Sequence, residues 1–117
     1  MNILIIKDFV GENAITLSDG QKIYDQIYPL LKSGNKVEID FNGVKVFAAP
    51  FFNGAIGQLL KEFKPVVLNE LLDLKHLSDF GKELAKRIIL NANQYYSNPA
   101  IKQSVDKAIA LQADSAW

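Results

Sequence analysis

Residues 37–60 read VEIDFNGVKVFAAPFFNGAIGQLL, and this stretch decides the fold. Apolar and charged residues alternate from Lys36 to Phe41, which predicts a strand with one buried face. Val44 to Phe47 is interpreted as a loop that contains at most a short extended piece. A helix is predicted from Pro50 to Phe63, because proline suits a first helical turn and apolar residues then recur at helical spacing.

Strands and helices alternate on both sides of this segment. The apolar run Ile3–Ile6 predicts a first strand that is covered on both faces, and Ser18 with Gln21 has the spacing of a capping box. Alternation of this kind is typical of an α/β domain with parallel pairing. The remaining predicted elements are a helix from Ser18 to Ser33, a strand at about Leu71–Lys75, a helix from Ser78 to about Tyr96 and a last helix at Pro99–Leu111.

The composition bounds the function. The chain has 117 residues, 49% of them hydrophobic, which fits one domain spanning residues 1–117. Its 13 basic residues balance 13 acidic ones, so the charge predicts attraction neither to nucleic acid nor to an anionic membrane. Cysteine is absent, which excludes disulfides, thiolate nucleophiles and cysteine-based zinc sites. No apolar run approaches membrane-spanning length, and we expect a cytoplasmic protein.

The order of elements around residues 37–60 resembles a known family. A strand that ends in Asp-Phe-x-Gly-Val (Asp40–Val44), then a short loop and a helix, resembles the STAS domain, named for sulfate transporters and anti-sigma-factor antagonists. It is most similar to the bacterial STAS-like family of unassigned function, and the resemblance extends over about Ile3 to Tyr96. It implies a small, mixed or mainly parallel sheet with helices packed on one face, and a protein that is not an enzyme.

The resemblance also implies what this chain lacks. In anti-sigma-factor antagonists, a serine at the start of the helix after this loop is phosphorylated by a partner kinase. The corresponding position here is Ala49 or Pro50, and neither side chain can accept a phosphoryl group. We therefore expect that this phosphorylation switch is absent or replaced by another control.

The resemblance places a protein-docking surface on the loop at Val44–Ala49 and on the helix after it. Its expected partner is an ATPase of the histidine-kinase type or a second copy of the chain. Among the clustered aromatic residues Phe47, Phe51 and Phe52, we expect Phe51 to be the exposed anchor, although all three could belong to the core. The expected partner-binding residues are Val46, Phe47, Phe51, Asn53 and Gly54.

The predicted helix contains two glycines, which would weaken it. Gly54 and Gly57 each weaken a helix by roughly 1 kcal/mol relative to alanine. We expect this cost to be offset by close approach of the helix to the sheet or to a partner.

Two other functions stay open from the residues alone. Asp40 and Asn42 could line a small-ligand or nucleotide pocket, because ligands gather at the carboxyl ends of parallel strands. The alternative is that Asp40 caps the backbone of the loop that follows it. An enzyme would need Asp40, Asp73 and His76 to converge. We expect no cofactor and no metal, since His76 is the single histidine and no ligand spacing surrounds it.

Overall fold

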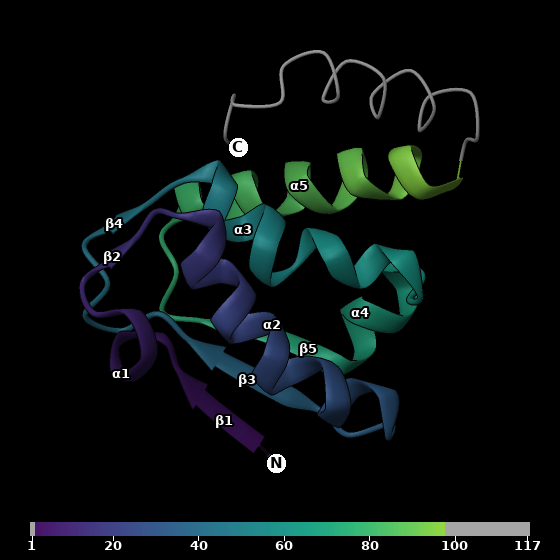
Figure 1. Ribbon diagram of the computed structural model, residues 1–117, viewed down its shortest axis with the longest axis horizontal. Helices are drawn as coiled ribbons and strands as arrows, with labels where there is room; N and C mark the ends of the chain where they lie inside the picture. Colours follow the sequence, from purple (N-terminus) through teal and green to yellow (C-terminus); the bar gives the residue numbers. More distant parts are fainter. Residues whose placement is uncertain (1, 98–117) are drawn as a thin grey trace.

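The computed structural model describes residues 2–97, and its centre is a three-stranded parallel sheet (Figure 1). The sheet has the order β1-β3-β5, with Leu4 opposite Ile39 and Ile39 opposite Leu74. A second parallel pair joins β2 to β4. The predicted α/β class with mainly parallel pairing is confirmed. The strands are β1 (Asn2–Ile5), β2 (Asn13–Ala14), β3 (Val37–Asp40), β4 (Val46–Phe47) and β5 (Leu72–Lys75).

The helices gather on one side of the three-stranded sheet (Figure 1). On β3, Val37 and Ile39 face the helices and are buried, whereas Glu38 and Asp40 point the other way. The resemblance implied this one-sided arrangement, and it is confirmed. The helices are α1 (Ile6–Val10), α2 (Leu17–Lys32), α3 (Ala49–Ala55), the 3₁₀ helix η1 (Gly57–Lys61), α4 (Pro65–Leu71) and α5 (Asp79–Ser97).

The prediction that the first strand is covered on both faces is wrong. Ile3 and Ile5 are exposed on the face that no helix of residues 2–97 covers, and Ile6 is buried as the first residue of α1. A continuous apolar run does not reveal which of its residues turn toward solvent, because burial depends on what packs against the strand.

Local signals located some helix ends and missed others. Ser78 Oγ accepts a hydrogen bond from the N–H of Gly81 at 3.1 Å, which confirms the predicted start of α5. The capping box at Ser18 and Gln21 is wrong, because Thr16 caps α2 through a 3.0 Å bond from the N–H of Asp19. Helix α4 was not predicted, and the helix predicted at Pro99–Leu111 lies outside the described residues.

The predicted helix from Pro50 to Phe63 is two elements. Helix α3 ends at Ala55, and η1 starts at Gly57 after a break at Ile56. The α3 half crosses α2 closely at two glycines. A Cβ on Gly54 would lie 2.6 Å from the carbonyl oxygen of Leu17, and a Cβ on Gly20 would overlap the carbonyl oxygen of Phe51. Gly54 thus allows α3 to approach helix α2 closely, whereas we expected an approach to the sheet or to a partner.

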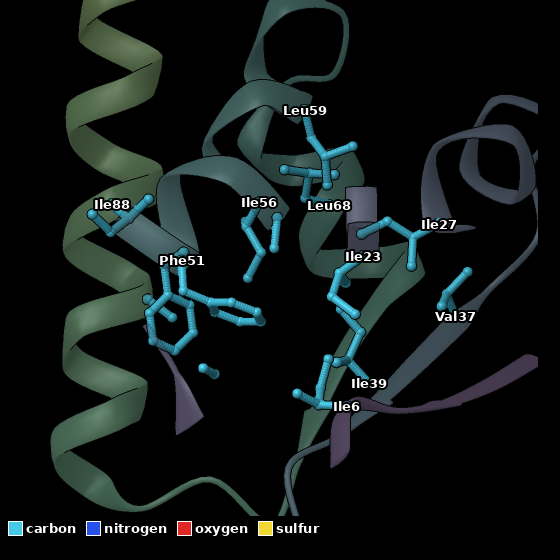
Figure 2. Close-up of a cluster of buried hydrophobic side chains, with 14 of the residues drawn as sticks. Ile6, Ile23, Ile27, Val37, Ile39, Phe51, Ile56, Leu59, Leu68 and Ile88 are labelled. Atoms are coloured by element: carbon cyan, nitrogen blue, oxygen red, sulfur yellow. The ribbon is translucent and has the colours of Figure 1, made fainter. Parts of the chain in front are cut away.

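The core lies between this helix layer and the sheet. Figure 2 shows Ile23 and Ile27 of α2 near Ile39 of β3, with Phe51 and Ile56 within the same cluster. Helices α2 and α3 both contribute side chains to this core, so its packing depends on how closely the two helices cross. Side chains from elements far apart in the sequence meet there.

Candidate functional site

Two aromatic rings stack at the surface where β4 lies beside the start of α5. Phe80 has 70% of its surface exposed, and its ring stacks on that of Phe47 with 5.8 Å between the centroids and 29° between the planes. Val46, next to Phe47, is also exposed. We call Val46, Phe47 and Phe80 the apolar patch.

The backbone fixes how the patch faces. The N–H of Val46 bonds to the carbonyl of Glu12, and the N–H of Ala48 bonds to the carbonyl of Ala14, so β4 is tied to β2. Successive side chains of a strand point in opposite directions. Val46 accordingly faces solvent, while Phe47 turns toward the core.

Phe47 connects the patch to the interior. Its ring meets that of the fully buried Phe52 edge-on at a centroid distance of 5.8 Å, and it also stacks on the ring of Phe80. Such pairs contribute about 0.5–1.5 kcal/mol beyond the area they bury. Phe80 is therefore held on an ordered support rather than on a free loop.

Gly81 makes room for this arrangement. A Cβ at position 81 would lie 2.5 Å from Cδ1 of Leu77 and 2.9 Å from Cζ of Phe47. With glycine here the ring of Phe47 lies against the first turn of α5, and a side chain at this position would force Leu77 and Phe47 to shift. The patch thus depends on one glycine that follows Phe80 directly.

The expectation that Phe51 is an exposed anchor is wrong, because its exposed fraction is 0%. Figure 2 shows it inside the buried cluster, and its ring also meets that of Phe41 edge-on. The face of α3 that carries Phe51 and Phe52 turns inward, because α3 packs on α2 through Gly54. The alternative that all three aromatic residues belong to the core is correct for Phe51 and Phe52, whereas Phe47 is half-buried.

The five residues predicted to bind a partner therefore separate. Val46 and Phe47 lie in the apolar patch, whereas Phe51 and Gly54 are buried, and Asn53 is half-buried. A buried side chain offers no surface for docking.

Sequence reasoning missed Phe80. It stands four residues before Leu84 on α5, a spacing typical of one apolar helix face. Nothing in the sequence alone distinguishes it from a core residue. Its position in the first turn carries it past the edge of the core.

At the carboxyl ends of β3 and β5, Asp40 meets His76. Oδ1 of Asp40 accepts a 2.8 Å bond from the N–H of Asn42, and it lies 2.8 Å from Nδ1 of His76. The bond from Asn42 chiefly, and His76 next, hold the pKa of Asp40 below its usual value. Asp40 thus caps its own loop, as the structural interpretation proposed.

The side chains named for catalysis come together only in part. His76 contacts Asp40, while Asp73 lies 3.2 Å from Lys75 in an ion pair. His76 has a φ of 57°, a left-handed conformation that non-glycine residues adopt uncommonly. This conformation turns the chain from β5 toward α5.

A shallow pocket lies at the opposite ends of these strands. Its volume is about 180 Å³, and Lys36, Asn69 and Asp73 are among the residues that line it. Typical small-molecule sites have roughly 300–1,000 Å³. Since Asp40 ends β3 and Lys36 precedes it, this pocket does not support a ligand site built on Asp40 and Asn42.

Residues 2–97 contain neither a candidate metal cluster nor a candidate membrane-spanning helix. No cluster of three or more histidine, cysteine or acidic side chains there could hold a metal ion. No helix in that range combines the length and apolarity needed to cross a membrane.

The fold and the patch place the chain among small α/β domains with a parallel sheet that is covered on one face. The family model described as a STAS-like domain of unknown function (DUF4325) matches residues 19–91, well over half of the chain. The chain belongs to this family, and the resemblance drawn from residues 37–60 is confirmed. No curated protein and no solved structure matches it.

Ala49 and Pro50, the positions that the resemblance relates to a phosphorylated serine, lie at the start of α3. Helix α3 begins at Ala49, with Pro50 in its first turn, and Ala48 before it makes no side-chain cap. Both residues stand in the first turn of the helix and carry no hydroxyl group.

Proposed function

We propose that this protein is a non-catalytic interaction module that docks on another protein through the apolar patch. The observation that carries the proposal is the exposed ring of Phe80. It stacks on the ring of Phe47, which in turn packs on the buried Phe52. Aromatic side chains dominate the binding energy of protein interfaces when a partner encloses them. Burying a phenylalanine side chain completely contributes about 1.5–3 kcal/mol.

The patch is suited to docking because it is already ordered. Phe47 fixes the ring of Phe80, so less side-chain freedom is lost on binding than for an isolated aromatic residue. Val46, which precedes Phe47 on β4, is exposed as well. The family resemblance supports the location, since STAS domains engage partners through the loop before this helix.

The partner we propose is a protein with an apolar pocket that encloses Phe80. An ATPase of the histidine-kinase type is the first candidate, because the resemblance includes anti-sigma-factor antagonists. Equal numbers of acidic and basic residues indicate that overall charge does not drive the encounter. We also propose a regulatory role in the cytoplasm. Control by phosphorylation at Ala49 or Pro50 is not part of this proposal.

The test compares two substitutions at matched positions. Phe80→Asp removes the anchor at the second residue of α5. Val66→Asp removes a residue of similar exposure, 61% against 70%, at the second residue of α4. Acidic residues are favourable in a first helical turn, so both variants should fold. Proteins captured by the wild type are identified, and the dissociation constant is then measured for each variant.

We expect Phe80→Asp to weaken binding by at least about 30-fold, the effect of losing a central anchor. Val66→Asp should leave the affinity within about threefold of the wild type. Circular dichroism must show that both variants are folded. Unchanged binding by a folded Phe80→Asp variant would remove the apolar patch from the interaction.

A further inference from the structure

The sheet β1-β3-β5 has two free edges, and they differ in chemistry. Within residues 2–97, β1 pairs with β3 only, and β5 pairs with β3 only. Strand β5 carries the charged residues Asp73 and Lys75, which protect an edge from further pairing. Strand β1 reads NILI and has neither a charge nor a proline. The edge at β1 is therefore the unprotected one.

The open face of the sheet shows the same asymmetry. Across that face Ile3 stands in line with Glu38 and Asp73, and Ile5 stands in line with Asp40 and Lys75. Ile3 is 60% exposed, and Ile5 is exposed as well. On this face the apolar side chains therefore lie along one edge, on β1, which we call the apolar rim. Strands β3 and β5 carry charged side chains there. An all-parallel sheet normally has both faces covered.

We propose that β1 pairs in antiparallel fashion with β1 of a second copy of this chain, which joins two three-stranded sheets into one of six strands. A twofold axis at this edge places the two apolar rims side by side, so one surface is complementary to itself. The strand is uncharged, and no like charges oppose each other across the new pair. The free backbone groups of β1 would be hydrogen-bonded as well.

The pleat restricts the register of this pair. Residues directly opposite each other in an antiparallel pair point to the same face, so Ile3 and Ile5 must face outward-pointing residues of the second copy. The register centred on Leu4 satisfies this within the four residues of the strand. It places Ile3 opposite Ile5 of the second copy on the open face. Leu4, half-buried and packed on the core, then meets its own counterpart on the helix side.

A second copy fits this edge better than an unrelated strand does. A foreign strand would have to supply apolar side chains on both faces and no charge, and β1 itself has this pattern. The contact is short, at the small end of specific interfaces. The dimer should therefore dissociate on dilution and exchange rapidly.

Disulfide crosslinking tests both the edge and the register, because the chain contains no cysteine. The variants Ile3→Cys and Ile5→Cys are prepared separately, mixed in equal amounts and oxidised with diamide. Opposed residues have Cα atoms about 4.5–5.5 Å apart, within the range that disulfides span. We expect the mixture to give a covalent dimer. Each variant alone should give at least about fivefold less, because two identical positions lie offset along the strands, beyond disulfide reach.

The matched control is the other edge. A mixture of Asp73→Cys and Lys75→Cys should crosslink no more than either variant alone. Equal crosslinking at both edges, or none above the single variants at β1, would overturn the proposal.

Sedimentation gives a second test that does not depend on oxidation. The wild type should gain dimer as its concentration rises, and Ile3→Lys should stay monomeric with an unchanged circular dichroism spectrum, since Ile3 is exposed. A wild type that remains monomeric, or a variant that still dimerises, contradicts the pairing at β1.

Discussion

Within the short segment from Val46 to Gly54, one end lies on the surface and the other is sealed in the core. Val46 and Phe47 form part of the apolar patch, whereas Phe51 and Gly54 are buried against α2. A glycine permits close packing in each place, Gly81 beside Phe47 and Gly20 beside Gly54. The difference is that backbone meets backbone at the helix crossing, while at the patch a ring packs on a helix end and leaves Phe80 outside.

Substitution of the buried and of the exposed aromatic residue should separate the two regions most clearly. Phe51→Ala leaves a cavity in the core and should lower the free energy of unfolding by about 3–5 kcal/mol. Phe80→Ala removes an exposed ring and should cost about 1 kcal/mol or less. Urea unfolding followed by circular dichroism measures both. Similar losses for the two variants would mean that Phe80 belongs to the core.

The next effect concerns the helix crossing. Gly54→Ala forces a methyl group against the backbone of α2 and should cost about 3 kcal/mol, because backbone atoms cannot move aside separately. Gly57→Ala is the matched control, since its nearest neighbour is the side-chain oxygen of Asn53 at 3.3 Å, which can adjust. Thermal unfolding of the two variants compares them. If Gly54→Ala matched the wild type, the close crossing would be wrong.

The smallest effect is expected at Asp40, whose carboxylate stabilises the fold by capping its own loop. Its folded pKa lies below the unfolded value, so the ionised carboxylate stabilises the fold above about pH 4, and this stability is lost as the pH falls through the folded pKa. Asp40→Asn should cost about 1 kcal/mol at pH 7. The difference from the wild type should shrink at pH 3. Urea unfolding at both pH values measures it, and a difference independent of pH would contradict this role.

The sequence predicted the elements whose signals are local. The alternation at Lys36–Phe41 and the cap at Ser78 reflect neighbouring residues, and the structure has both features. The break at Ile56 and the burial of Phe51 depend on the crossing with α2, which no local pattern encodes. Phe80 was missed for the same reason, because its exposure follows from where α5 begins relative to Phe47.

The central position of β3 has a consequence for how the chain folds. Asn2 pairs with Val37, and Val37 pairs with Leu72, so both strand pairs close loops of equal length. During synthesis β1 emerges first and has no partner until α2 and β3 have followed it. The sheet then stays half-built until β5 arrives. Loops of this kind slow folding, and throughout that interval Leu4 and Ile6, which pack in the finished core, are exposed to any chaperone that recognises short apolar segments.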